Sequence, residues 1–352
     1  MSPAQRAAPV SLEQGRVLRC SRNSFSVQIH SGAVLECHIK GKVLKDSVRF
    51  YNPLAPGDIV SVEAESPHSA KGRIVSLEKR RTAFTRFNAK GQLPQLLAAN
   101  ADMVLCLTTP ESPPFRPRFI DRVLLQAEAA GIEAAVVCNK CDLGFKDIDV
   151  EERLEDFIRV GYETFRVSAR TGESLDKLLS FIQDKTVVLI GQSGVGKSSL
   201  LNALSPGLNL KTGALNEKYD RGNHTTVMPL MLELPPEKDN RGATGRTRII
   251  DTPGIRMFIT HGITADDIIV HMREFAPFAG ACSFGLSCSH RTEPGCKIIE
   301  AVHAGVIHED RYNSFLRMYD EISGSPVSFA GRARAAAPPA AGGLPADDCY
   351  DE

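Results

Sequence analysis

The sequence predicts a multidomain α/β protein with three folded parts, on three observations. Short strand-like segments separated by turns run from Leu12 to about Leu77, and they predict a small antiparallel β-barrel. From about Ala99 to Gly254, apolar strand-like runs alternate with amphipathic segments, which predicts a mostly parallel sheet with helices on both faces. Beyond residue 260, apolar residues at helical spacing flank a cysteine-rich segment, and they predict a small helical domain.

Composition limits the class of protein. The chain has 352 residues and a formal net charge of zero, so its overall charge does not point to nucleic acid. The charge is uneven, because residues 11–90 hold 14 Lys and Arg against 7 Asp and Glu. No apolar run approaches the roughly 20 residues that span a bilayer, and Met1–Pro9 lack the apolar stretch of a signal peptide. We therefore expect a cytoplasmic protein that does not enter a membrane.

The nine cysteines do not resemble a disulfide framework in a chain of this length. Three of them cluster near residue 290, and the others are scattered. Cys106 and Cys138 lie in apolar strand-like runs, so we expect packed, unreactive thiols at both positions.

The first part, residues 11–85, contains five or so short strands and an excess of basic residues. A basic five-stranded barrel suits an oligonucleotide-binding (OB) fold, in which a positive face follows a phosphate backbone. An ordinary solvated β-domain fits the same pattern, and this stretch alone does not decide between the two. The basic run Lys79–Phe87 follows, with Phe84 and Phe87. These rings either stack on bases or hold the connection against the next domain, and we favour the second role.

The α/β domain places three polar loops directly after strand-like runs. The loops begin at Asn139, Ser168 and Gly191. Ligands of parallel α/β sheets bind at the carboxyl ends of the strands, so we expect the three loops to form one site. The expected strands are Ala101–Thr108, Glu133–Cys138, Glu163–Val167 and Thr186–Ile190, and the expected helices are Phe119–Ala130, Val150–Val160 and Leu175–Ile182.

The loop after the last of these strands reads G-Q-S-G-V-G-K-S-S and matches the G-x-x-x-x-G-K-[ST] pattern of a phosphate-binding loop. Its glycines let successive N–H groups turn toward an anion, and the following helix N-terminus adds partial positive charge. Lys197 is expected to reach the β- and γ-phosphates, and Ser198 to hold Mg²⁺. A turn that binds nothing is the disfavoured alternative. The nucleotide-binding residues expected here are Gly191, Gln192, Ser193, Gly194, Val195, Gly196, Lys197, Ser198 and Ser199.

Two short motifs indicate a guanine base. Asn139-Lys140-Cys141-Asp142 matches the N-K-x-D pattern of guanine-nucleotide-binding proteins. An ionised Asp142 accepts two hydrogen bonds from guanine, whereas adenine lacks the amine and presents an acceptor at N1. Ser168-Ala169 resembles the loop whose backbone N–H contacts the guanine oxygen. Each motif is common by chance, but with the phosphate loop they predict a site for GTP and GDP.

Asp251-Thr252-Pro253-Gly254 follows a strand-like run and matches D-x-x-G. Asp251 is expected to hold Mg²⁺ through water, and the Gly254 N–H to meet the γ-phosphate. Ordinary turn chemistry is the alternative for this tetrapeptide, and only the accompanying motifs favour a site.

The segment 221–226, R-G-N-H-T-T, supplies candidates for the hydrolytic step. Thr225, in preference to Thr226, is expected to complete the Mg²⁺ shell, and His224 is a candidate to activate water. A mobile polar loop with an idle histidine is the open alternative. Ile255 follows Gly254, where small GTPases have a glutamine that orients the attacking water. Hydrolysis is therefore expected to be slow without a partner or another residue.

The order of the motifs is unusual. N-K-x-D and S-A precede the phosphate loop, whereas common GTPases have them after D-x-x-G. This order predicts a circularly permuted P-loop GTPase domain. Permutation costs the site little, because termini and loop tips tolerate being rejoined.

On these residues the chain resembles the ribosome small-subunit-dependent GTPase A family (RsgA/YjeQ), cytoplasmic bacterial GTPases that act in maturation of the 30S subunit. Segments Gly191–Leu204, His224–Thr226 and Asp251–Gly254 carry the match, which extends over about residues 12–322. The resemblance implies an OB-fold that contacts ribosomal RNA, a permuted GTPase domain and a zinc-binding C-terminal domain. It also implies that His224 is a candidate to activate water in place of glutamine.

Cys282, Cys288, His290 and Cys296 lie within fifteen residues, and three thiolates with one imidazole suit tetrahedral Zn²⁺. The family pattern has four residues between the first two cysteines, whereas this chain has five, so we expect a different loop with the same ligands. A redox cluster and incidental cysteines are the disfavoured alternatives. Helices are expected within Thr264–Phe275 and Lys297–Ile322, and the metal is expected to staple them together.

The function expected is GTP hydrolysis in late maturation of the 30S subunit. We expect a monomer that binds this subunit and its rRNA and is stimulated by it, with GTP or GDP, Mg²⁺ and one structural Zn²⁺. Another permuted ribosome-assembly GTPase and a GTP-dependent RNA-binding scaffold with little hydrolysis are the alternatives. The expected boundaries are a disordered leader at 1–10, the OB-fold at 11–85, a linker at 86–98, the GTPase domain at 99–260, the zinc domain at 261–322 and a disordered tail at 323–352.

Overall fold

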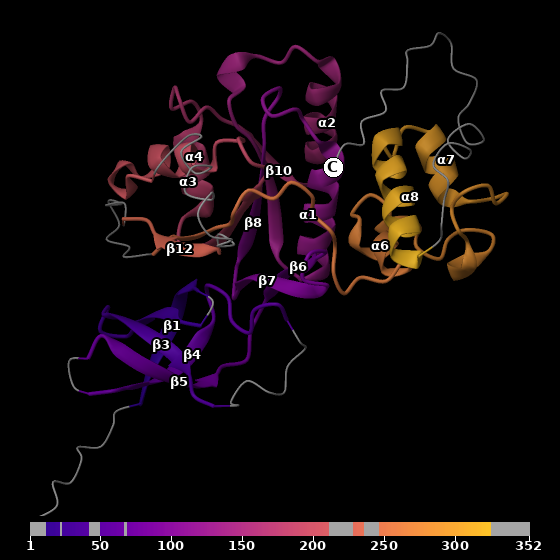
Figure 1. The fold of residues 1–352 in the computed structure, drawn as a ribbon. Coiled ribbons are helices and arrows are strands. Elements are labelled where there is room, and N and C mark those ends of the chain that lie inside the picture. The colour runs from indigo at the N-terminus through magenta and orange to yellow at the C-terminus, as the bar shows by residue number, and fades with distance from the viewer. Residues whose placement is uncertain are drawn as a thin grey trace, which may run out of the picture. The chain divides into compact units, whose positions relative to one another are not determined.

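The computed structural model divides the chain into two compact units, Met1–Ile263 and Thr264–Glu352 (Figure 1). The expected leader and the tail from residue 325 lie outside the described residues. The structure describes residues 12–21, 23–41, 50–66, 69–210, 228–235 and 246–324.

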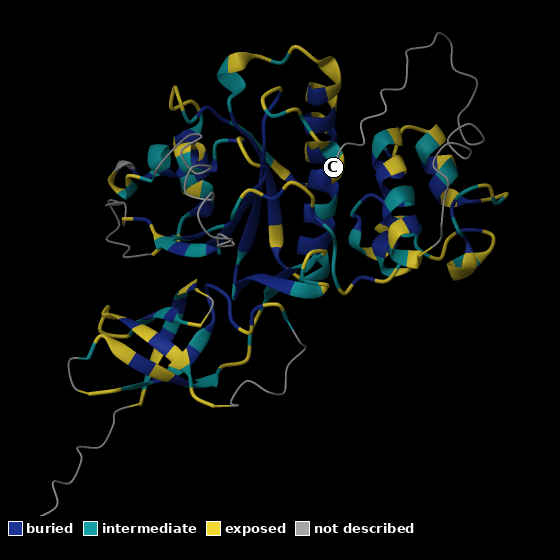
Figure 2. Cartoon of the chain, viewed as in Figure 1, coloured by how far each residue is buried: buried dark blue, intermediate teal, exposed yellow. Residues whose placement is uncertain are grey.

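The first unit begins with a closed five-stranded barrel, as the sequence predicts, but the barrel is not wholly antiparallel, because β3 and β5 pair in parallel. The strand order is β1-β2-β3-β5-β4, and β4 pairs back with β1. Alternate side chains face inward, and Val17, Val27 and Ile74 are fully buried among them. Exposed residues occupy the alternate positions (Figure 2). The strands are β1 (Leu12–Cys20), β2 (Phe25–Ile29), β3 (Val34–Ile39), β4 (Ile59–Ala64) and β5 (Lys71–Leu77).

Residues expected to form a linker are instead an antiparallel hairpin of β6 (Ala83–Asn88) and β7 (Leu93–Ala99). The polar stretch that ends near Gln95 suggested a connection, but its residues pair across the hairpin, where Arg86 lies opposite Gln95. In this two-stranded sheet Pro94 lies near the start of its strand, where a missing N–H is tolerated. Phe84 is fully buried, and its ring stacks on Phe258 with the centroids 5.8 Å apart. Its contacts agree with the favoured role of attaching this segment to the α/β domain.

The α/β domain is built on the strand order β10-β9-β8-β11-β13-β12. Neighbouring strands are parallel except β12, which runs antiparallel to β13. β12 also pairs with the barrel, where Leu230 faces Arg19 of β1, so one sheet passes from the α/β domain into the barrel. The strands are β8 (Met103–Thr108), β9 (Glu133–Cys138), β10 (Glu163–Arg166), β11 (Thr186–Gly191), β12 (Leu230–Glu233) and β13 (Arg248–Asp251).

Helices cover both faces of this sheet, in agreement with the strand–helix alternation (Figure 1). Val104 and Val136 contribute to the core under α1 and α2. Leu105 and Val137, the next residues along, contribute to the core under α3 and α4. The helices and short 3-10 turns are α1 (Pro117–Ala129), η1 (Cys141–Leu143), α2 (Ile148–Arg159), α3 (Leu175–Ile182), α4 (Lys197–Leu204) and η2 (Pro206–Leu208).

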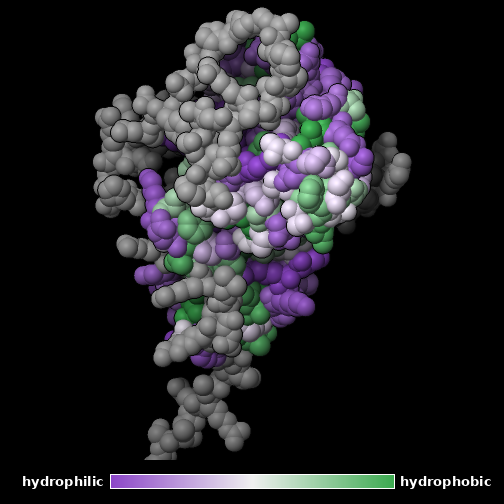
Figure 3. Space-filling model, turned by 90° about the vertical axis from the view of Figure 1, so that its right-hand side faces the viewer, coloured by the Kyte–Doolittle hydropathy of each residue, from purple (hydrophilic) through white to green (hydrophobic). Residues whose placement is uncertain are grey.

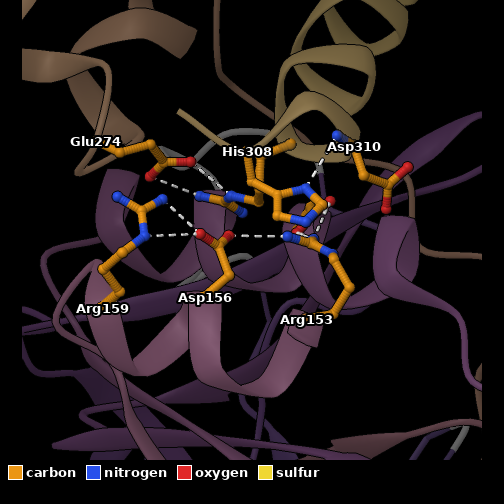
Figure 4. A network of polar contacts seen from close by, with 8 residues as sticks. Arg153, Asp156, Arg159, Glu274, His308 and Asp310 are labelled. Atoms are coloured by element: carbon orange, nitrogen blue, oxygen red, sulfur yellow. Dashed lines mark hydrogen bonds and ion pairs between the residues drawn. The ribbon is translucent and has the colours of Figure 1, made fainter. Parts of the chain in front are cut away.

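Buried charges fix α2 against α1. Arg153 contacts Asp156 on the same helix at 2.9 Å and Asp121 of α1 at 3.1 Å. Asp156 also pairs with Arg159 at 2.5 Å, as Figure 4 shows. Because Arg153, Asp121 and Asp156 are almost fully buried, removing one partner would leave an uncompensated charge, which is strongly destabilising.

The second unit is helical, and helices lie within both segments where the sequence predicts them. Two helices share residues 297–323, and they are separated near Gly305, whose φ of +70° does not continue a helix. Phe275 and Phe315 stack with their ring centroids 5.0 Å apart, and buried Glu274 accepts a hydrogen bond from Arg311 at 2.5 Å. The elements are α6 (Asp267–His271), η3 (Ala276–Phe278), η4 (Gly285–Ser287), α7 (Lys297–His303) and α8 (Glu309–Ser323).

Hydrophilic and hydrophobic residues are interspersed on the face shown in Figure 3. Within the described ranges, every helix is too short or too polar to cross a bilayer.

Candidate functional site

The phosphate loop and the N-K-x-D motif are in direct contact. β11 ends at Gly191, and α4 begins at Lys197. Between them Gly194 and Gly196 have φ of +85° and +90°, conformations that favour glycine. A Cβ on Gly196 would lie 2.5 Å from the Asn139 Nδ2 atom, so this glycine is also required by the close approach of the two motifs.

Asn139 joins three loops. Its side chain is 1% exposed, its Nδ2 donates to the Val195 carbonyl at 3.0 Å, and its Oδ1 accepts the Ala169 N–H at 3.0 Å. Lys140 adds a second link, because its Nζ donates to the Gly194 carbonyl at 2.8 Å and to the Ser112 carbonyl at 2.6 Å. The structure therefore brings together N-K-x-D, S-A and the phosphate loop, as their positions at strand ends predict.

Asp142 is held as a carboxylate at the mouth of this site. Its Oδ1 accepts the Ser168 hydroxyl at 2.6 Å, and its Oδ2 accepts Arg170 Nε at 2.8 Å. The Ser168 hydrogen bond, followed by the Arg170 contact, lowers the pKa of Asp142 against the opposing effect of burial. Sequence reasoning missed Arg170. Its position directly after Ser168-Ala169 was the only signal.

Lys197 and Asp251 are two buried, oppositely charged residues at the phosphate loop. Lys197 Nζ donates to the carbonyls of Gly191 at 2.9 Å and Gln192 at 3.1 Å. Burial lowers the pKa of Lys197, and Asp251 opposes that shift. Burial raises the pKa of Asp251 to about 6, against the effect of Lys197. Asp251 Oδ1 is buried and has no hydrogen-bond partner among the described residues. A buried oxygen of this kind needs a partner, and a carboxylate oxygen is a suitable ligand for Mg²⁺.

The D-x-x-G glycine packs on the phosphate loop. A Cβ on Gly254 would lie 2.8 Å from Ser193 Cα and 3.0 Å from its backbone nitrogen. The next residue, Ile255, donates its N–H to the Gly191 carbonyl at 3.2 Å, and its side chain is 4% exposed within the core. Ile255 is therefore unable to orient a water molecule, as its apolar character indicates.

Replacing Gly254 by alanine is expected to weaken nucleotide binding by about tenfold, because the added methyl group pushes the backbone away from Ser193. Titration of a fluorescent GDP analogue measures the change. Gly207→Ala is the matched control, since a Cβ there meets nothing within 4 Å. Equal affinities of the two variants would contradict the close packing of Gly254 on the loop.

The remaining predicted residues divide into two groups. Ser193 and Ser199 are exposed, Ser198 is half-buried at the start of α4, and Val195 and Gln192 are buried. His224 and Thr225 lie outside the described residues, so their roles stay predictions.

The second unit gathers the predicted metal ligands. Cys282, Cys288, His290 and Cys296 are buried, and their ligand atoms all lie within 4.8 Å of one another. The Cys282 and Cys296 sulfurs are 3.8 Å apart, and each is 3.5 Å from His290 Nδ1. A tetrahedral zinc ion, with Zn–S of about 2.3 Å and Zn–N of about 2.0 Å, requires edges of about 3.8 Å and about 3.5 Å. The donor set therefore fits Zn²⁺.

Contacts around the ligands hold them in place. The Lys297 N–H donates to the Cys282 sulfur at 3.3 Å at the start of α7. The Tyr312 hydroxyl of α8 donates to the His290 carbonyl at 2.6 Å. The long Cys282–Cys288 spacing contains the turn η4, which accommodates the additional residue while the four ligand atoms converge.

The chain is similar in sequence to known GTPases. The family model described as RsgA GTPase matches residues 77–261. The small ribosomal subunit biogenesis GTPase RsgA of Flavobacterium johnsoniae is 34% identical over 311 residues, which cover 87% of this chain and 92% of that protein. The protein of the same name from Gemmatimonas aurantiaca is also 34% identical, over 88% of this chain and 97% of its own.

Two solved structures have the same fold. The crystal structure of YjeQ from Thermotoga maritima matches with a TM-score of 0.67 at 27% identity, over 89% of this chain and 99% of that one. YloQ, described as a circularly permuted GTPase, matches with a TM-score of 0.63 at 24% identity, over 92% of this chain and 98% of its own. On the family model and the curated relatives, this chain belongs to the RsgA GTPase family and is a GTPase.

Proposed function

We propose that this protein binds and hydrolyses GTP during maturation of the small ribosomal subunit. The observation that carries the proposal is the side chain of Asn139, which bonds to both the phosphate loop and the S-A loop. The base and phosphate motifs thereby become one site. The relatives are named for small ribosomal subunit biogenesis, which supports that subunit as the partner.

In the proposed mechanism each described loop binds a different part of GTP. Asp142 accepts hydrogen bonds from the N1–H and amine of guanine, and the backbone N–H groups of the phosphate loop donate to the phosphates. The Ala169 N–H donates to Asn139 Oδ1, so it orients Asn139 instead of contacting the base as the sequence suggested. Lys197 neutralises charge on the β- and γ-phosphates. Ser198, Asp251 and Thr225 would hold Mg²⁺, which supplies electrostatic stabilisation of the transferred phosphoryl group.

Water activation is assigned to His224, since Ile255 is buried in the core. The imidazole is suited to accept the proton of an attacking water near neutral pH. We also propose that the barrel is an OB-fold that contacts rRNA. Its exposed Lys71 and Arg73 on β5 suit a phosphate backbone. The protein is proposed to act as a cytoplasmic monomer, with zinc in the Cys282–Cys296 site.

Purified small ribosomal subunits are expected to raise the rate of GTP hydrolysis by at least about tenfold, because this chain lacks a glutamine after Gly254 and a partner can complete the site. Phosphate release is measured with and without subunits, and purified large subunits are the control. Lys197→Ala should abolish the stimulated rate. Equal rates with and without small subunits would remove the coupling, and stimulation by large subunits alone would favour a different ribosome-assembly GTPase.

A further inference from the structure

Two cysteines enclose the centre of the guanine-recognition motif. Cys138 is the last residue of β9, and Cys141 is the first residue of the turn η1. The segment therefore reads C-N-K-C, and the residues between the thiols are Asn139 and Lys140. Recognition of guanine by N-K-x-D does not require either thiol.

The fold places both thiols on one side of the chain. Cys138 is fully buried in the core under α1 and α2, and Cys141 is partly buried against the same core. Lys140 has a φ of +64°, which turns the chain back, and Cys141 Sγ lies 3.1 Å from the Cys138 carbonyl. The Cys141 thiol donates this hydrogen bond, and both cysteine side chains pack against the same core. Cys138 is packed in the core, as the sequence predicts, and a second cysteine lies three residues further on.

The two thiols differ in reactivity. Hydrogen bonding from Cys138 and the Val167 contact lower the pKa of Cys141 against the effect of burial. The hydrogen bond to Cys141 and burial raise the pKa of Cys138. The half-exposed Cys141 is thus the attacking thiolate, and the buried Cys138 is the resolving thiol, which is the division of roles in other C-x-x-C pairs.

We propose that Cys138 and Cys141 are a redox modification site, in which a low-molecular-weight disulfide oxidant converts the pair to an intramolecular disulfide that weakens guanine-nucleotide binding. The regulatory half of this inference rests on the proposed GTP site. Formation of the disulfide does not.

The reaction is an ordinary thiol–disulfide exchange. The Cys141 thiolate attacks one sulfur of the oxidant RSSR, a mixed disulfide forms, and RS⁻ leaves. Cys138 then loses its proton and attacks the Cys141 sulfur, so the Cys138–Cys141 bond forms and a second RS⁻ leaves. The two cysteines lose two electrons and two protons, and the oxidant is reduced to two RSH.

The disulfide acts on the site through the residues that it encloses. An S–S bond of about 2.0 Å with Cβ atoms about 3.8 Å apart fixes the geometry of the turn. Asn139 and Lys140 lie within that turn and bond to Val195 and Gly194 of the phosphate loop. Shifting either side chain weakens the contact between the base and phosphate loops.

The first readout is the disulfide itself. Zinc-loaded full-length protein is incubated with oxidised glutathione, free thiols are alkylated, and peptides are mapped by mass spectrometry. The peptide with both cysteines is expected to be lighter by two hydrogen atoms and unalkylated until it is reduced. Cys106, a fully buried thiol of β8 in the same core, is the internal control and is expected to remain free. Complete alkylation of both Cys138 and Cys141 after oxidant treatment would overturn the proposal.

The second readout is affinity for a fluorescent GDP analogue. Oxidation is expected to raise the Kd by about tenfold, equivalent to about 1.4 kcal/mol, and reduction is expected to restore it. Cys138→Ala should bind nucleotide as the reduced protein does and resist the oxidant, whereas Cys106→Ala should remain sensitive. Zinc release is followed in parallel. A loss of affinity that persists in Cys138→Ala, or that follows zinc release, would overturn the regulatory role. Failure of the reduced protein to bind GDP would instead contradict the proposed function.

Discussion

Asp142→Asn is expected to weaken GTP binding by at least about 100-fold and to improve binding of xanthosine triphosphate. The Asp142 carboxylate presents two acceptors to the N1–H and amine of guanine, whereas an amide presents one acceptor and one donor. The NH₂ group of the asparagine would face the NH₂ group of guanine, so both donors would lack an acceptor. An unpaired donor in a binding site weakens binding strongly. Xanthine has a carbonyl in place of that amine, so it accepts the new donor.

The measurement is competition of GTP, xanthosine triphosphate and ATP against a fluorescent nucleotide. Arg170, the ion-pair partner of Asp142, has a side chain that is 75% exposed, so loss of this pair should change the melting temperature little. Asp149→Asn, which removes an exposed carboxylate from the first turn of α2, is the matched control. Equal competition by ATP and GTP on the unmodified protein would contradict guanine recognition by Asp142.

The loops of the nucleotide site were predictable because their chemistry is local. Gly196 and Lys197 follow an apolar strand at fixed spacing, and Asn139 follows another. Parallel strands end at the same edge of a sheet, so the proximity of the loops followed from the strand–helix alternation. The close approach of the two loops is visible only in the structure. A Cβ added to Gly196 would lie 2.5 Å from Asn139 Nδ2.

The features that were missed depend on partners distant in sequence or on short turns. Arg170 contacts Asp142, which lies 28 residues away, and neither residue indicates the pairing by type alone. β12 joins the barrel through Leu230 opposite Arg19, a pairing that no local pattern encodes. The hairpin of β6 and β7 was missed because its turn and the adjacent strand ends are polar and its strands form a separate two-stranded sheet, so their local pattern resembles a connection.

Removing zinc is expected to unfold the second unit while the first unit keeps its nucleotide site. The described part of this unit, residues 264–324, is small, and domains of this size usually need a metal or a disulfide in addition to their hydrophobic core. Four of its buried residues are the predicted metal ligands Cys282, Cys288, His290 and Cys296. Metal binding at such sites contributes about 10 kcal/mol to folding, more than most small domains have in reserve.

The experiment adds a chelator to the full chain and follows helical circular dichroism, released zinc and GDP affinity together. We expect one zinc per chain to be released, with a partial loss of helical signal and less than about a twofold change in Kd. The nucleotide contacts of the described loops all lie before residue 264, so the two readouts should separate. Cys296→Ser should reproduce the effect without chelator, whereas Cys20→Ala, which removes a buried thiol from the barrel, should retain the metal. An undiminished helical signal after complete zinc release would mean that the aromatic stack of Phe275 on Phe315 and the Glu274–Arg311 pair hold this unit without the metal.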